Sequence, residues 1–134
     1  MSYTIDGKVI AAPENMTILE AARANGIEIP TLCYLKNVSN IGSCRLCMVE
    51  VSTPNRSPAT AGLLLPACKT LPREGMAILT KTERLEHYRR EMLKLLLSNH
   101  RTDAQETVVG RTVRRLRVHN AVVLHDSWVS PAAA

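Results

Sequence analysis

The sequence predicts an α+β domain, and three observations support this. Short apolar segments bounded by Gly, Pro, Asn and Ser are typical of strands. Two other segments begin with helix-capping signals. Of the 134 residues, 46% are hydrophobic and 22% are charged, which suits one globular domain with an extension. Together these features indicate a small mixed sheet crossed by one helix.

The first two strands are predicted on either side of Asp6-Gly7. Tyr3 and Ile5 precede this pair, and Val9 follows it. Type I′ turns need two residues that tolerate positive φ, so Asp-Gly between apolar residues predicts a β-hairpin.

A helix over about 18–25 follows the hairpin. Thr17 is its predicted N-cap, and Glu20, three residues later, completes a capping box. Gly26 lies where a helix commonly ends in the left-handed conformation. The helix is therefore bounded at both ends by local signals.

The middle of the chain predicts short strands separated by loops. Residues 30–47 show no sustained period and are expected to form an irregular loop. The Pro-, Ser- and Thr-rich residues 53–62 form a second loop. Strands are expected at 48–52 and at 76–79, and a short apolar segment, 63–65, leads into Cys68.

The longest periodic stretch predicts an amphipathic helix over about 82–99. Thr80 and Glu83 offer a second capping box at its start. The apolar face predicted from its period consists of Leu85, Tyr88, Met92, Leu95, Leu96 and Asn99.

All four cysteines belong to one pattern: Cys33, ten residues, Cys44, two residues, Cys47, twenty residues, Cys68. A C-x-x-C pair lets two sulfurs reach one metal centre from a single tight loop. Four loop-borne thiolates satisfy a [2Fe–2S] cluster, and backbone N–H groups around them can donate to the sulfurs. Four thiolates also satisfy a structural zinc ion, although zinc modules usually pair two such knuckles. Disulfides or unligated thiols are the remaining alternative.

The residues around these cysteines resemble a known family. The segments Gly42-Ser43-Cys44-Arg45-Leu46-Cys47-Met48-Val49-Glu50-Val51 and Leu65-Pro66-Ala67-Cys68, with Cys33-Tyr34 before them, carry the likeness. They resemble the N-terminal [2Fe–2S] domain of the NADH dehydrogenase large iron–sulfur subunit. The same domain occurs in the small diaphorase subunit of NAD-reducing hydrogenases, in NAD-dependent formate dehydrogenases and in iron-only hydrogenases. The resemblance covers roughly residues 2–100.

The resemblance implies a β-grasp [2Fe–2S] ferredoxin-like fold, followed by the long amphipathic helix and a C-terminal extension. It implies that Cys33, Cys44, Cys47 and Cys68 bind one [2Fe–2S] cluster, the cofactor and metal site of the chain. Arg45 is expected to offset part of the cluster charge, and no residue is expected to be catalytic.

The similarity ends after the long helix. In this family Asn-His at the helix end precedes a [4Fe–4S] site spaced His-x3-Cys-x2-Cys-x5-Cys. Here Asn99 and His100 are kept, but the three cysteine positions hold Ala104, Thr107 and Val113. None of these three side chains binds iron, so we expect no [4Fe–4S] cluster.

We expect three regions: a [2Fe–2S] domain over 1–82, the helix over 83–100 and a partner-binding extension over 101–134. The extension contains five Arg against three carboxylates, so it contributes part of the net charge of +5. Its apolar segment 118–124 and Trp128 offer contacts that so short a tail cannot bury alone.

Other functional classes find little support in the sequence. Aromatic residues that would stack on nucleic-acid bases make up only 3% of the chain, so the Arg-rich tail does not predict nucleic-acid binding. No apolar run reaches the roughly 20 residues of a membrane span. Phosphate loops and nucleophile motifs are missing, so the chain is expected to be non-catalytic alone.

The expected function is one-electron transfer within a multisubunit oxidoreductase of the hydrogenase, formate dehydrogenase or NADH dehydrogenase type. Its partners would be larger redox subunits of the flavin/NAD, hydrogenase or formate dehydrogenase kind. The N-terminus lacks the pattern of a secretory signal, so the cytoplasm is the expected location. The alternatives are a zinc- or cluster-stapled assembly subunit without a redox role, and a freestanding ferredoxin shuttle.

Overall fold

The computed structural model describes residues 2–11, 13, 15–54 and 61–98. One compact unit comprises residues 1–85, and a second begins at Glu86. The predicted extension and His100 lie outside the described residues. Within the described part, no helix has the length and apolar character that crossing a bilayer requires.

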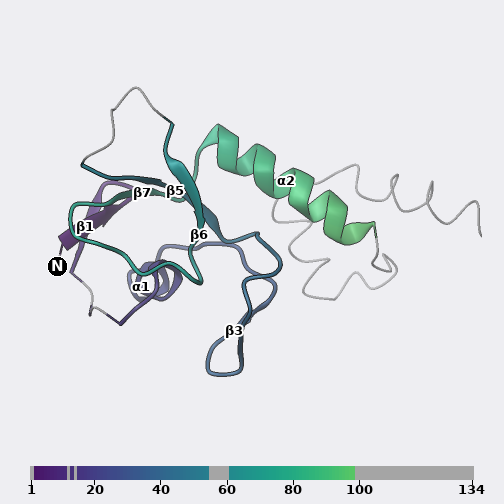
Figure 1. Cartoon of the computed structure of the whole chain (residues 1–134), viewed down its shortest axis with the longest axis horizontal. Helices are drawn as coiled ribbons and strands as arrows, with labels where there is room; N and C mark the ends of the chain where they lie inside the picture. The colour runs from purple at the N-terminus through teal and green to yellow at the C-terminus, as the bar shows by residue number, and fades with distance from the viewer. Residues whose placement is uncertain (1, 12, 14, 55–60, 99–134) are drawn as a thin grey trace, which may run out of the picture. The chain divides into compact units, whose positions relative to one another are not determined.

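The first unit is built on a five-stranded mixed sheet with the order β2-β1-β7-β5-β6 (Figure 1). β1 pairs in parallel with β7, and every other pairing in this sheet is antiparallel. The predicted α+β, β-grasp-type fold is therefore confirmed. The strands of the sheet are β1 Ser2–Ile5, β2 Lys8–Ala11, β5 Met48–Ser52, β6 Leu63–Pro66 and β7 Ala77–Leu79.

The β1–β2 hairpin forms as predicted at Asp6-Gly7. Both residues have positive φ, 50° and 80°, as a type I′ turn requires. The turn sets the register in which Ile5 pairs with Lys8 and Tyr3 pairs with Ile10. Tyr3, Ile5 and Ile10 are consequently buried.

Helix α1, Ile18–Ala24, lies against the sheet and supplies much of the core. The predicted capping box is present: Thr17 Oγ1 accepts from the Glu20 N–H, and Glu20 accepts from the Thr17 N–H. Ile18 and Leu19 are fully buried among sheet residues. Each such side chain stabilises the fold by about 1.5–3 kcal/mol, so this face holds α1 in place.

A two-stranded hairpin within the cysteine-containing loop was not predicted. β3, Tyr34–Leu35, pairs antiparallel with β4, Ser39–Asn40, in a separate sheet. Its turn contains Asn37 in the left-handed conformation, with φ 63°. Two-residue strands give no measurable period, so the sequence pattern could not reveal them.

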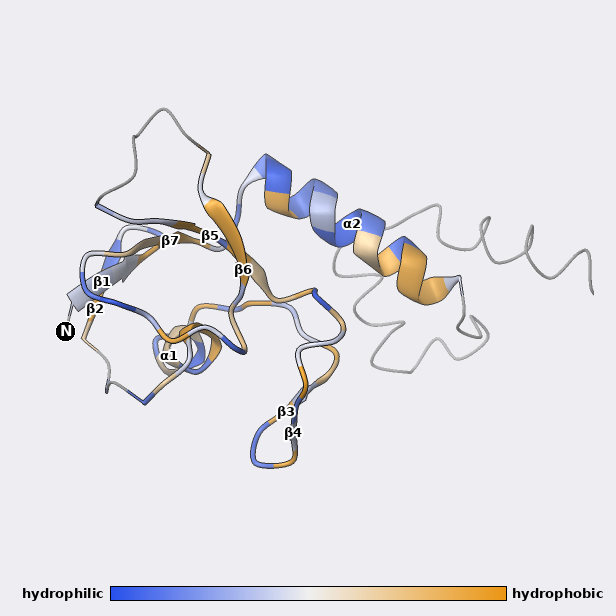
Figure 2. Ribbon diagram, in the orientation of Figure 1, coloured by the Kyte–Doolittle hydropathy of each residue, from blue (hydrophilic) through white to orange (hydrophobic). Residues whose placement is uncertain are grey.

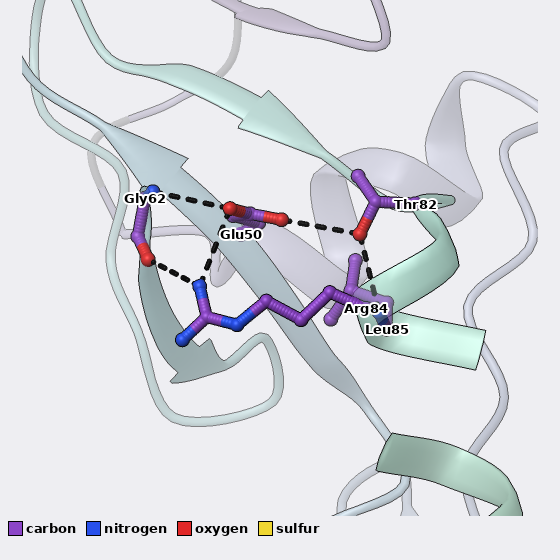
Figure 3. A network of polar contacts seen from close by, with 5 residues as sticks. All are labelled: Glu50, Gly62, Thr82, Arg84 and Leu85. Carbon is purple, nitrogen blue, oxygen red and sulfur yellow. Dashed lines mark hydrogen bonds and ion pairs between the residues drawn. The ribbon is translucent and has the colours of Figure 1, made fainter. Parts of the chain in front are cut away.

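Glu50, in the middle of β5, forms hydrogen bonds both with Gly62, just before β6, and with the start of the long helix (Figure 3). Its carboxylate accepts hydrogen bonds from the Gly62 N–H at 3.1 Å and from the Thr82 hydroxyl at 3.1 Å. Arg84 Nη1 lies 3.4 Å from Glu50 and donates to the Gly62 carbonyl at 3.0 Å. A Cβ at Gly62 would lie 2.6 Å from Glu50 Cγ, so this close approach requires glycine.

The long helix α2 covers Glu83–Leu97, and its N-cap differs from the predicted one. Thr82, not Thr80, accepts from the Leu85 N–H at 3.1 Å. Thr80 is buried and instead donates through its N–H to Asp6 at 2.7 Å. The capping-box prediction at Thr80 and Glu83 was wrong because a long-range partner binds Thr80.

The buried row of α2 also differs from the predicted face. Its members are four residues apart: Leu85, Arg89, Leu93 and Leu97. Leu95, which the period assigned to the apolar face, is 63% exposed. The first half of α2 is hydrophilic and its end hydrophobic, so most of the apolar residues that could define a face come late (Figure 2).

Candidate functional site: a four-cysteine centre

The four cysteines come from three loops that flank the sheet. Cys33 directly precedes β3, Cys44 and Cys47 lie in the loop before β5, and Cys68 follows β6. None of them forms a disulfide. Cys44, Cys47 and Cys68 are buried, whereas Cys33 is half-buried. The centre therefore reaches the surface most closely at Cys33.

The β5–β6 pairing positions two of the cysteines. Met48 pairs with Pro66, and beyond this pair the Ala67 N–H donates to the Cys47 carbonyl at 3.0 Å. The contact places Cys47 beside the residue that precedes Cys68. Both thiols are only 1% exposed, so they are held by the buried end of a strand pair.

The other three cysteines all affect the pKa of the Cys68 thiol. Burial raises the pKa of Cys68 to about 12, and the neighbouring Cys47 as well as the charges of Cys33 and Cys44 contribute in the same direction. Cys68 therefore lies near the other three cysteines of the predicted pattern.

Backbone N–H groups of the Cys44–Cys47 loop point at sulfur. The Cys44 N–H donates to Cys33 Sγ at 3.5 Å. Burial alone would raise the pKa of Cys33, but hydrogen bonds from Cys44 and Ser43 lower it overall. Burial raises the pKa of Cys44, and a backbone hydrogen bond from Leu46 opposes that rise. The loop is therefore arranged to stabilise negative charge on sulfur.

Gly42 allows the loop before Cys44 to pack against the residue after Cys68. Its φ is 69°, and a Cβ there would lie 3.0 Å from Lys69 Cγ. Lys69 Nζ donates to the Asn40 carbonyl at 2.7 Å. This contact joins the Cys33–Cys44 segment to the Cys68 loop, so all three cysteine loops support one another.

The Cys68 loop is also held by α1. The first N–H groups of that helix, those of Ile18 and Leu19, donate to the carbonyls of Thr70 at 2.9 Å and Ala67 at 3.0 Å. Helix N-termini leave such donors without partners inside the helix. Here they fix the backbone on both sides of Cys68.

Sequence reasoning missed a polar cluster beside Cys33. The Tyr34 hydroxyl donates to Glu20 Oε1 at 3.0 Å, and the Arg23 guanidinium lies 5.0 Å from the centre of the Tyr34 ring. Arg23 also donates to the Thr31 hydroxyl at 2.9 Å. An aromatic residue directly after a cysteine, in a chain poor in aromatics, is the signal that could have indicated it.

The donor set fits a two-iron centre. In the described part of the chain, no three His, Cys, Asp or Glu side chains are arranged around a single metal ion. A [2Fe–2S] cluster divides its four thiolates between two irons, so its ligands spread more widely than those of one ion. Four clustered free thiols with backbone donors aimed at sulfur meet this requirement.

Comparison with known proteins matches this chain to an iron–sulfur domain family and to subunits of oxidoreductases. The family described as 2Fe-2S iron-sulfur cluster binding domain matches residues 1–83. The chain is 44% identical over 103 residues to the NADPH-Fe(3+) oxidoreductase subunit alpha of Geobacter sulfurreducens, covering 77% of this chain and 11% of that protein. It is 32% identical over 103 residues to the mitochondrial NADH-ubiquinone oxidoreductase 78 kDa subunit of Candida albicans, covering 77% of this chain and 13% of the relative.

A solved structure shows the same fold. The structure described as NAD+-reducing [NiFe]-hydrogenase in the H2-reduced state superposes with a TM-score of 0.75 at 27% identity, covering 88% of this chain and 50% of that one. The chain thus spans only 11% and 13% of the two curated relatives named above and half of the solved one. On the family match and these identities, the chain belongs to the family of 2Fe-2S iron-sulfur cluster binding domains.

Proposed function

We propose that this chain is a one-electron carrier with a single [2Fe–2S] cluster, acting within a multisubunit oxidoreductase. The observation that supports it best is the set of four free cysteines on neighbouring loops, with the Cys44 N–H donating to Cys33 Sγ. Cys33, Cys44, Cys47 and Cys68 would be the ligands, two for each iron. When bound, the cluster accepts and releases one electron, and substrate chemistry takes place on other subunits.

The chain's own residues set the conditions for that transfer. The Cys44 and Ser43 donors stabilise the anionic thiolate of Cys33. Burial of Cys47 and Cys68 keeps water from two of the ligands. Arg45 is exposed between Cys44 and Cys47, where its charge offsets part of the centre's negative charge.

The partners would be larger redox subunits of the flavin/NAD, hydrogenase or formate dehydrogenase type. The relatives are named as subunits of oxidoreductases and hydrogenases, which supports this assignment. Residues 101–134 would contribute to the contact with such a subunit. The four free cysteines also suit the reducing cytoplasm as the place of action.

Iron and acid-labile sulfide per chain test the cofactor, together with EPR of the anaerobically dithionite-reduced protein. We expect two irons, two sulfides and a rhombic S = 1/2 signal. Cys→Ser at position 33, 44, 47 or 68 should abolish or strongly reduce that signal, while Ala61→Ser, which also introduces serine, should retain it. Zinc without sulfide would contradict the redox role, and additional irons would contradict a single cluster.

Deletion of residues 101–134 tests the extension. We expect the truncated chain to keep its iron and sulfide but to lose co-purification with the redox subunit that the full chain retains. Undiminished co-purification would overturn the partner-binding role of the extension.

A further inference from the structure

Three large apolar side chains are exposed next to the most accessible cysteine. Leu35 is 60% exposed, Val38 is 81% exposed and Ile41 is 70% exposed. All three lie on or beside the β3–β4 hairpin, which projects from the sheet between Cys33 and Cys44 (Figures 1 and 2). Exposed apolar residues gathered in one place mark sites of protein contact.

The hairpin is also hollowed. A cavity of about 250 Å³ is bordered by Tyr34, Leu35, Val38 and Asn40, with Glu20 at its inner side. It is open to solvent and is lined by Tyr34, the residue that follows the half-buried Cys33. A side chain from another protein can enter here without any movement of the sheet.

The charge around this hairpin has one sign. Residues 29–49 and 61–72 contain no Asp or Glu. Lys36, Arg45 and Lys69 are exposed in these two segments, and the Lys69–Asn40 contact places Lys69 against the base of the hairpin. Three cations thus accompany the exposed apolar side chains.

Glu20, the one carboxylate among the described residues that border the cavity, already has hydrogen-bond partners. Its oxygens accept from the Thr17 N–H and hydroxyl and from the Tyr34 hydroxyl. Arg23 lies over the Tyr34 ring beside it. The Glu20 carboxylate is therefore bound by residues of its own domain, and the exposed charge around the hairpin remains positive.

We define the hairpin surface as Leu35, Lys36, Val38, Ile41, Arg45 and Lys69. We propose that the hairpin surface is the docking site for an electron-exchanging partner protein whose contact face carries apolar side chains ringed by carboxylates. This inference rests on the proposed electron-carrier function and specifies its partner. Complementary charge brings the partner in, and the apolar centre is buried on contact. The electron then crosses at Cys33, the least buried ligand.

Two haem proteins of similar size and opposite charge serve as probes: cytochrome b5, which is acidic, and cytochrome c, which is basic. In each reaction one electron leaves the reduced chain, returning its iron pair to the diferric state, and reduces one haem from Fe(III) to Fe(II). Stopped-flow spectroscopy follows the haem. As the salt concentration increases from a low value, we expect the rate constant with cytochrome b5 to fall at least tenfold. The rate constant with cytochrome c should rise.

Charge reversal then locates the effect. Lys36→Glu/Arg45→Glu should slow reduction of cytochrome b5 about tenfold or more at low salt. Arg73→Glu/Lys8→Glu is the matched control, because it changes the net charge equally away from the hairpin. The N–H of Gly75, two residues after Arg73, donates to the Ser2 carbonyl at 2.9 Å, at the start of β1, and Lys8 lies on β2. Equal slowing by both pairs would overturn the assigned location.

A separate variant, Val38→Ser, tests the apolar part of the hairpin surface. Val38→Ser should slow cytochrome b5 reduction at high salt, where charge is screened, while leaving the salt dependence unchanged. Val38 is 81% exposed, so the substitution leaves the core intact. No effect of Val38→Ser would contradict an apolar centre of the contact.

Carbodiimide crosslinking separates this proposal from the redox function itself. Lysines of the hairpin surface should join to cytochrome b5 carboxylates, with crosslinks at Lys36 and Lys69 but not at Lys8, located by mass spectrometry. If the chain carries zinc in place of iron, hairpin crosslinks would still support docking while the redox function fails. If iron and EPR are as expected but crosslinks fall elsewhere, the docking proposal fails alone.

Discussion

The Thr80 hydroxyl donates to the carboxylate of Asp6, although the two residues are 74 positions apart. The Thr80 N–H donates to the other carboxylate oxygen at 2.7 Å. One side chain in the β1–β2 turn thereby accepts two hydrogen bonds from the end of β7. The two hydrogen bonds hold the β1–β2 turn against the end of β7, the strand that pairs with β1.

Removing this hydroxyl should lower the stability of the fold. Thr80→Val keeps the shape of the buried side chain but leaves a carboxylate oxygen of Asp6 without its donor. Hydrogen bonds to charged groups contribute about 1.5–3 kcal/mol, so the midpoint of thermal unfolding should fall by several degrees. Thr80→Ser retains the hydroxyl and should lie much closer to the wild type. Similar midpoints for the valine variant and the wild type would show that the bond contributes little.

Removal of the Glu50 side chain should destabilise the fold more than removal of the Arg84 side chain. The Glu50 side chain is 13% exposed and accepts from three donors, whereas the Arg84 side chain is 50% exposed. Glu50→Ala leaves donors of Gly62 and Thr82 unpaired and should cost about 1–3 kcal/mol. Arg84→Ala removes a solvent-exposed partner and should cost below about 1 kcal/mol.

Urea unfolding of the two single variants and the double variant measures this asymmetry and the coupling between the residues. A larger loss for Arg84→Ala than for Glu50→Ala would be inconsistent with the network described.

Glu20 predicts an acid-sensitive contribution to stability. Its pKa lies below the ordinary value of 4.5, chiefly because the Thr17 N–H donates to the carboxylate. A lowered folded-state pKa stabilises the fold fully above the unfolded-state pKa, and this stability is lost as pH falls through the folded-state pKa. Glu20→Gln should therefore be less stable than the wild type at pH 7, by about 0.5 kcal/mol for this partly exposed group.

Thermal midpoints of both proteins at a series of pH values from 7 downward give the measurement. The difference between them should stay constant above about pH 5 and shrink as the solution becomes more acidic. A difference that grows with acidity would contradict the assigned sign.

Tyr3 offers a stabilising substitution. Its hydroxyl is buried and finds no hydrogen-bond partner among the described residues, and burial raises the pKa of Tyr3. A buried unpaired hydroxyl costs about 1–3 kcal/mol, so Tyr3→Phe should raise the thermal midpoint by a few degrees or leave it unchanged. Tyr34→Phe, which removes a paired hydroxyl, should lower it. A clear loss of stability in Tyr3→Phe would reveal a partner for that oxygen.

Local signals in the sequence predicted the local parts of the fold. The Asp6-Gly7 turn, the Thr17–Glu20 capping box and the strand over 48–52 depend on residues within a few positions of each other, and all three are present. The N-cap of α2 failed because Asp6 competes for Thr80 from the far end of the domain. Strand order was likewise beyond local patterns, since β7 separates β1 from β5 through contacts made only after folding.

The four cysteines were indicated by the sequence as candidate ligands, and that assignment stays a prediction, whereas the contacts around them were not indicated. The chain contains four cysteines, and all four are free. The contacts that hold them, such as the Lys69–Asn40 bond and the packing of Lys69 against Gly42, join loops distant in sequence. No periodicity or motif encodes such contacts, because they arise from how three irregular segments meet.

The parallel pairing of β1 with β7 determines when this domain can be completed during synthesis. The β1–β2 hairpin is local and can form early, but a lone hairpin is only marginally stable in water. The other edge of β1 remains open until residue 79 has been made. All four cysteines precede that point, so every thiol has emerged before the sheet closes. The four thiols are therefore accessible in an incomplete fold, and β7, the last strand of the sheet to be made, closes it after all four cysteines have been made.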